Sequence, residues 1–140
     1  IGIGSLLLDG IGDTIRVSLT GDPEKEIDTA KRILKAVGAR VFGPEIIACP
    51  TCGRCQVDLV SIVRELEEKL KKDYRPLTID HRLLIAIMGC EVNGSGEAKN
   101  ADIGIAFGSG KGAIFAGGKI VKTVDAKDAV RELMEIINGQ

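Results

Sequence analysis

The sequence is poor in aromatic residues and histidine, and it has no excess of either charge. It contains no Trp, one Tyr, three Phe and one His, and 19 Lys and Arg against 20 Asp and Glu give a net charge of −1. Proteins that stack nucleobases need aromatic platforms, and proteins that follow a phosphate backbone need a basic surface. The composition therefore argues against a nucleic-acid partner and against binding to an anionic membrane surface.

Long apolar runs and an export signal are also missing. No apolar run approaches the roughly 20 residues that span a bilayer, and the N-terminus lacks a charged segment followed by an apolar stretch. We therefore expect no membrane partner and a cytoplasmic location. The chain of 140 residues begins at Ile1 rather than Met, so we expect a fragment of a longer protein. Its four cysteines are too few for a disulfide scaffold and favour a metal or redox role in a reducing compartment.

The first third of the chain predicts helices around one strand. Residues 1–10 predict a short helix, which their glycines weaken. Thr14–Leu19 alternates between apolar and polar residues and predicts a strand with Arg16 and Ser18 on its polar side. A helix is expected to begin at Asp22-Pro23 and to stop at Gly38. Its buried stripe would consist of Ile27, Ala30, Ile33, Leu34 and Val37.

The remainder alternates between strand and helix patterns and then turns to strands joined by glycine turns. Helices are expected at residues 57–71 and over Ala126–Ile137. Strands are expected at Glu45–Ala48, Leu83–Met88, Asp102–Phe107, Gly112–Ala116 and Ile120–Val124. This order predicts an α/β domain with a mixed sheet flanked by helices.

Two short loops carry the cysteines, and each follows an expected strand. The first loop is Cys49-Pro50-Thr51-Cys52-Gly53-Arg54-Cys55, and the second runs from Cys90 to Glu97. Strand ends that carry thiols can bring them together at one edge of a sheet. Three or four sulfurs at such a point predict a metal site.

The spacing alone leaves the kind of site open. Cys-x2-Cys occurs in zinc ribbons, iron–sulfur proteins and thioredoxin-like dithiols. One interpretation is a structural zinc module that uses Cys49, Cys52, Cys55 and Cys90. Another is a redox protein in which Cys49 and Cys52 cycle between thiols and disulfide. The simplest alternative is a cluster of buried free thiols with no metal.

Longer motifs narrow these alternatives. They are Gly12-Asp13-Thr14-Ile15-Arg16-Val17-Ser18-Leu19, then Cys49-Pro50-Thr51-Cys52-Gly53-Arg54, Met88-Gly89-Cys90, Val92-Asn93-Gly94 and Gly96-Glu97-Ala98. In these motifs, taken in order, the sequence closely resembles the 4-hydroxy-3-methylbut-2-enyl diphosphate synthase family. That family contains the reductive enzyme of the methylerythritol phosphate route to isoprenoids.

The resemblance implies a 4Fe–4S cluster held by three thiolates and one carboxylate. Carried over position by position, the ligands are Cys49, Cys52, Cys90 and Glu97, and Glu97 is also the candidate catalytic residue. Cys55 would not be a ligand, because the family usually has Thr there. The sequence also has Ser95 where the family usually has Pro. A hard carboxylate among soft sulfurs is held less tightly and can yield its place to substrate.

The family's activity supplies the remaining expectations. Its members are oxidoreductases that open 2-C-methyl-D-erythritol 2,4-cyclodiphosphate to the linear allylic diphosphate, with electrons from ferredoxin or flavodoxin. The resemblance implies that Arg16 and Ser18 contact the diphosphate and that Asn93 reaches the substrate from the cluster domain.

The resemblance also implies a division into two domains. Residues 1–38 would be the last strand and helices of a TIM-type barrel, and residues 39–140 an iron–sulfur reductase-like domain that binds the cluster. In the family the cluster domain covers the barrel mouth, usually that of the partner subunit in a homodimer. We therefore expect this chain alone to be inactive and its barrel piece to expose apolar surface.

Overall fold

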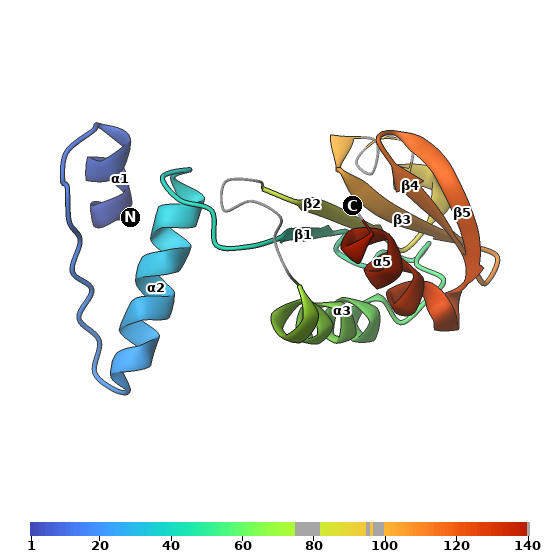
Figure 1. The fold of residues 1–140 in the computed structure, drawn as a ribbon, viewed down its shortest axis with the longest axis horizontal. Coiled ribbons are helices and arrows are strands. Elements are labelled where there is room, and N and C mark those ends of the chain that lie inside the picture. The colour runs from blue at the N-terminus through green and yellow to red at the C-terminus, as the bar shows by residue number, and fades with distance from the viewer. Residues whose placement is uncertain (75–81, 95, 97–99, 140) are drawn as a thin grey trace. The chain divides into compact units, whose positions relative to one another are not determined.

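The computed structural model of the protein describes residues 1–74, 82–94, 96 and 100–139. It separates into two compact units, of which unit 1 runs from Ile1 to Gly43 and unit 2 begins at Pro44. Unit 1 contains the helices α1 (Gly2–Leu8) and α2 (Pro23–Ala36) (Figure 1). Unit 2 contains, in order, β1 (Glu45–Ala48), α3 (Leu59–Asp73), β2 (Leu84–Met88), α4 (Glu91–Gly94), β3 (Ile103–Gly108), β4 (Lys111–Ala116), β5 (Lys119–Asp125), the 3-10 turn η2 (Ala126–Asp128) and α5 (Ala129–Asn138).

The start and the end of α2 follow the prediction. Asp22 occupies the N-cap position with extended backbone, and Pro23 is the first helical residue, where its fixed φ suits the helix. The chain leaves the helix through Gly38, whose φ of +73° is open to glycine without a steric penalty. The Asp22 carboxylate pairs with Lys25 at 3.1 Å. The terminal signals in the sequence were therefore sufficient to place this helix.

The prediction of a strand over Thr14–Leu19 is wrong, because none of the described residues of unit 1 is in a strand. The alternation of faces is nevertheless present: Ile15 and Val17 are half-buried, whereas Arg16 and Ser18 are exposed. A strand needs a neighbour that pairs with its backbone N–H and C=O groups. The segment is therefore extended but unpaired within the described part of unit 1.

The predicted buried stripe of α2 is only half-buried. Ala30, Ile33, Leu34 and Val37 have intermediate exposure, and Ile27 is 58% exposed. A helix buries its apolar face fully only when a second layer covers it. The expectation that the N-terminal piece exposes apolar surface is confirmed, because Leu6, Leu8, Ile11 and Leu19 are exposed as well.

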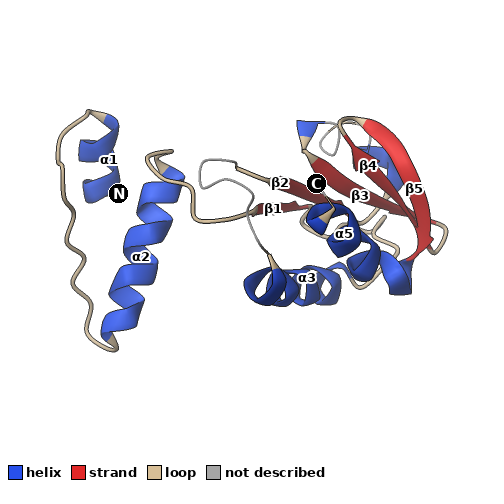
Figure 2. Ribbon diagram, in the orientation of Figure 1, coloured by secondary structure: helices blue, strands red, loops and turns tan. Residues whose placement is uncertain are grey.

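Unit 2 is built on a five-stranded mixed sheet, as predicted. The strands lie in the order β1-β2-β3-β4-β5. The pairs β1–β2 and β2–β3 are parallel, and β3–β4 and β4–β5 are antiparallel. Figure 2 shows the strands side by side, with α3 and α5 together on one side of them. The five strands expected from Glu45 onward each overlap an observed one, so the predicted fold class is confirmed.

The two faces of the sheet differ in how much they bury. Ile85 and Ile87 of β2 belong to the main core, which fills the space between the sheet and the helices α3 and α5. The alternate residues Ala86 and Met88 belong to a smaller cluster with Ala101 and Ala106. All four are at most 6% exposed. Because both of its faces are covered, β2 is an almost continuous apolar run, which is typical of a parallel strand.

Candidate metal centre

The two cysteine loops begin at the same edge of the sheet. β1 and β2 are parallel, and Ala48 is paired with Ile87 in the register, so the residues that follow each strand emerge side by side. The backbone N–H of Cys49 donates to the carbonyl oxygen of Ile87 at 3.2 Å. In return, the N–H of Gly89 donates to Cys49 Sγ at 3.2 Å. The strand ladder therefore holds the Cys49 sulfur against the segment that leads into Cys90.

Gly89 lies at the point where these sulfur atoms crowd the backbone. A Cβ on Gly89 would overlap Cys55 Sγ and would lie 3.3 Å from Cys55 Cβ and 3.5 Å from Cys49 Sγ. Real Cβ atoms essentially never approach another atom that closely, so the absence of a side chain at residue 89 leaves room for Cys55. Both Cys49 and Cys55 are half-buried. The structure thus brings together the sulfurs at residues 49 and 55 next to Cys90.

Cys52 is placed differently from Cys49. It is exposed, and a hydrogen bond from the backbone N–H of Arg54, supported by the Arg54 side chain, lowers the pKa of the Cys52 thiol below its ordinary value of 9.0. The N–H of Cys55 donates to the carbonyl of Cys52 at 2.9 Å, which turns the chain back toward Gly89. Thr51 has a φ of +39°, a conformation that costs energy for a β-branched residue. The loop is therefore tightly turned, with Cys52 at its outer side.

Gln56 ties the first loop to the rest of the sheet, a role that sequence reasoning missed. Its backbone N–H donates to the Gly89 carbonyl at 3.1 Å. Its side-chain oxygen accepts the N–H of Ser109, in the turn after β3, at 2.6 Å. The Cys55 thiol donates to the carbonyl of Val57 at 3.3 Å. The only sequence signals for these contacts were the Met88-Gly89-Cys90 motif and the position of Gln56 directly after Cys55.

The second loop is described only in part. Cys90 is 6% exposed, and α4 starts directly after it. The backbone of Asn93 lies in this short helix, but its side chain is outside the described part of the structure. Glu97 and Ser95 also lie outside the described residues. Their predicted roles therefore stay predictions.

The donor chemistry suits a thiolate-bound metal centre, although the described residues alone do not form a complete set of ligands. All four cysteines are free thiols. The Gly89 N–H on Cys49 Sγ is a donor to sulfur, the kind of contact that stabilises a thiolate and tunes a bound metal. Among the described residues, no three His, Cys, Asp or Glu side chains converge as a ready-made metal site. The fit therefore rests on Cys49, whose sulfur lies against Gly89 directly before Cys90, while Cys52 lies exposed in the same loop.

Beside Cys49 the surface is hollowed by a mainly apolar cavity of about 240 Å³. It lies between the end of β1 and the first turns of α3. Its lining residues are Ala48, Cys49, Thr51, Leu59, Val60, Val63 and Arg64.

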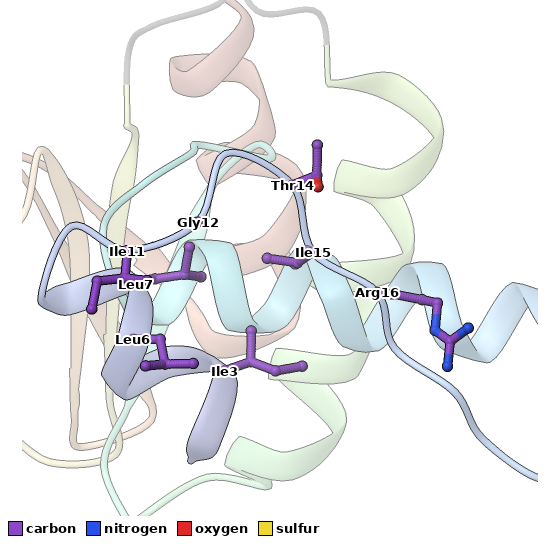
Figure 3. Close-up of a pocket in the computed structure, with 8 residues that line it drawn as sticks. All are labelled: Ile3, Leu6, Leu7, Ile11, Gly12, Thr14, Ile15 and Arg16. Atoms are coloured by element: carbon purple, nitrogen blue, oxygen red, sulfur yellow. The ribbon is translucent and has the colours of Figure 1, made fainter.

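The candidate diphosphate contacts lie in unit 1. Arg16 and Ser18 are exposed on the same side of the extended segment. Arg16 also lines a cavity of about 200 Å³ with apolar residues of α1 and of the segment after it. Figure 3 shows that the guanidinium of Arg16 lies at one end of this group, while Leu6, Leu7 and Ile11 gather at the other. An exposed guanidinium is free to bind an anionic oxygen by charge-assisted hydrogen bonds.

Two family models match the chain. Residues 45–139 match the GcpE protein C-terminal domain, and residues 1–31 match the GcpE TIM-barrel domain. The chain belongs to the GcpE family. The GcpE match changes from one model to the other between residues 31 and 45, an interval that contains the division between units 1 and 2. The boundary near residue 38 stays a prediction.

Curated GcpE-type relatives match almost the whole chain. The proteins of Clostridium perfringens and Caldicellulosiruptor saccharolyticus are 55% and 56% identical over 137 residues, and that of Aquifex aeolicus is 52% identical over 139 residues. Each is named 4-hydroxy-3-methylbut-2-en-1-yl diphosphate synthase (flavodoxin). The matches cover 98–99% of this chain but only 37–38% of the relatives. The chain therefore spans a little over a third of their length, and the resemblance seen in its motifs is confirmed.

None of the helices in the described part of the chain is both long and apolar enough to cross a bilayer.

Proposed function

We propose that this chain is the C-terminal part of a 4-hydroxy-3-methylbut-2-enyl diphosphate synthase and carries its 4Fe–4S site. The observation that carries the proposal is the hydrogen bond from Gly89 to Cys49 Sγ, at 3.2 Å, across the ends of two parallel strands. It places the sulfur of Cys49, one proposed ligand, beside Gly89, which directly precedes Cys90, another proposed ligand. The proposed ligands are Cys49, Cys52, Cys90 and Glu97.

The proposed reaction is the two-electron reductive opening of 2-C-methyl-D-erythritol 2,4-cyclodiphosphate, with loss of a hydroxyl as water. When bound, the cluster would supply the electrons and a Lewis-acidic site. The chain's own residues would bind and orient the substrate. Arg16 and Ser18, which are exposed on one side of their segment, would hold diphosphate oxygens, and Asn93 would contact the substrate from unit 2.

The proposed electron donor is flavodoxin or ferredoxin, and the relatives' names specify flavodoxin. We further propose that the active enzyme is a homodimer in which unit 2 of one protomer covers the barrel of its partner. The present chain contains only residues that match the barrel model at positions 1–31. On this proposal it binds a cluster but turns over substrate only when the rest of the barrel is supplied.

Anaerobic reconstitution of the reduced chain with ferrous iron and sulfide tests the cluster. We expect about four irons and four sulfides per chain and a brown chromophore that dithionite reduces. Cys52→Ser should abolish this chromophore, whereas Cys55→Ser, the matched control three residues away, should retain it. The reverse result would overturn the ligand assignment.

The position of Cys55 gives a four-thiolate zinc site a specific structural basis, because Cys55 and Cys49 border the same point near Gly89. The reconstitution therefore includes zinc alone as a separate arm. Zinc binding at one ion per chain that Cys55→Ser abolishes, together with failure to form the brown chromophore, would favour the structural zinc module.

A further inference from the structure

The sulfurs of Cys49 and Cys55 border one small volume beside Gly89. Both lie within 3.5 Å of the position that a Cβ on Gly89 would occupy. The two sulfurs therefore border the same point, and rotation about each Cα–Cβ bond is the movement that would bring them toward the roughly 2.05 Å of an S–S bond. Both thiols are free, and both are half-buried rather than sealed in the core, so a small reagent can reach them.

The Cys-x2-Cys spacing would instead pair Cys49 with Cys52. In the described loop Cys52 is exposed at the outer side of its turn, whereas Cys49 and Cys55 border the same point beside Gly89. The turn closed by the bond from the Cys55 N–H to the Cys52 carbonyl, at 2.9 Å, returns Cys55 to the side of Cys49. The third cysteine of the loop therefore borders the same point as the first.

We propose that Cys49 and Cys55 form an oxidation site, in which a low-molecular-weight disulfide converts them to an intrachain disulfide when no metal is bound. One thiolate attacks the small disulfide and releases one small thiol. The second protein thiolate then displaces the other small thiol from the mixed disulfide. Two electrons pass from the protein to the small disulfide, and the two thiol protons end on the two small thiols released.

The disulfide would block metal loading, because it consumes the thiolate of a proposed ligand. The pairing itself does not depend on the proposed function, but this consequence rests on it. Cys55 would thus have a role although it is not a proposed ligand. It would protect Cys49 from irreversible oxidation, since a disulfide is restored by thiols whereas a sulfonic acid is not.

The test treats the reduced, metal-free chain anaerobically with oxidised glutathione and then blocks the remaining thiols. Trypsin cleaves after Arg54, which places Cys49 and Cys52 in one peptide and Cys55 in the next. A Cys49–Cys55 disulfide therefore joins two tryptic peptides, whereas a Cys49–Cys52 disulfide closes a loop within one. We expect the joined pair, released by dithiothreitol, as the main intrachain product.

Two variants assign the link. Cys52→Ser should still give the joined peptides, and Cys55→Ser should not. A main product closed within the first peptide, joined peptides that Cys52→Ser abolishes, or glutathione adducts with no intrachain link would each overturn the proposal.

Iron and sulfide uptake after oxidation tests whether the Cys49–Cys55 disulfide blocks metal loading, which is a separate question from whether the disulfide forms. Oxidised wild-type chain should incorporate at least tenfold less iron than reduced chain, and dithiothreitol should restore it. If the Cys49–Cys55 link forms and iron loading is unchanged, the pairing stands and the ligand role of Cys49 in the proposed function fails.

Discussion

Substitution of Gly89 by Ala measures how closely Cys55 packs at the centre of the cysteine loops. The added methyl would overlap Cys55 Sγ and lie 3.3 Å from Cys55 Cβ. Gly89 is not among the residues with positive φ, so the substitution should add no backbone strain. Forcing an extra methyl into a packed site typically costs about 1–3 kcal/mol. We expect Gly89→Ala to lower the free energy of unfolding by an amount in that range.

Removal of the opposing sulfur should remove most of this penalty. In a Cys55→Ala background the overlapping atom is gone, and only the 3.3 Å approach to Cβ and the 3.5 Å approach to Cys49 Sγ are left. Ala is favoured over Gly by about 0.4–1 kcal/mol where the backbone tolerates it, because Gly loses more freedom on folding. Gly89→Ala should therefore be close to neutral in that background, with a coupling energy of about 1–3 kcal/mol between the two sites.

Gly53 is the matched control, because it lies in the same loop region and a Cβ there would meet no atom within 4 Å. Gly53→Ala should be neutral or slightly stabilising. The assay is urea unfolding of the reduced, metal-free chain, followed at the backbone amide resonances of β2 so that it reports on unit 2. Equal destabilisation by Gly89→Ala in both backgrounds, or none in the wild type, would refute the packing argument.

Two further predictions concern the scaffold. Side-chain and backbone hydrogen bonds from Ser61 lower the pKa of Asp58 below its ordinary value of 3.8, so their stabilisation is full above about pH 4 and is lost as the pH falls through the lower folded pKa. Asp58→Ala should thus unfold in less urea than wild type at pH 7, and the difference should shrink steadily toward pH 2; a constant difference would contradict this. Ile105→Ala, at a position 0% exposed, should cost about 2–5 kcal/mol in urea unfolding. Ile27→Ala, at a position 58% exposed, should stay within about 0.5 kcal/mol, and a large effect there would reveal a covering surface.

Local signals in the sequence were sufficient for most of the scaffold. Pro23 and Gly38 bracket α2 because the constraints they impose on the backbone act within the helix itself. The apolar run of β2 predicted a strand, since both of its faces are covered in unit 2. The segment Thr14–Leu19 has an equally clear alternation of apolar and polar residues. A strand, however, forms only when its backbone pairs with a second segment, and the sequence pattern of one segment does not show whether that partner is present.

The candidate site was harder to predict, because residue spacing gives the types of ligand but not the path of a loop. Cys-x2-Cys predicts that Cys49 and Cys52 share one ion, whereas the structure places the sulfurs of Cys49 and Cys55 around one point beside Gly89. The reason is the turn after Cys52 and the hydrogen bond that Gln56 makes to Gly89. The first is a local turn of an irregular loop and the second is a contact between distant segments, and the sequence contains no periodic signal for either.

The strands of unit 2 lie in the sheet in the same order as in the chain. During synthesis each new strand can therefore pair with the strand that was translated directly before it. The pairing of β1 with β2, which sets Cys49 beside Gly89, is complete in principle before the C-terminal hairpin has been translated. Nascent chains that stop after residue 94 would thus already carry all four cysteine sulfurs and the backbone donor of Gly89, so the three proposed thiolate ligands, Cys49, Cys52 and Cys90, are present before the C-terminal hairpin is translated.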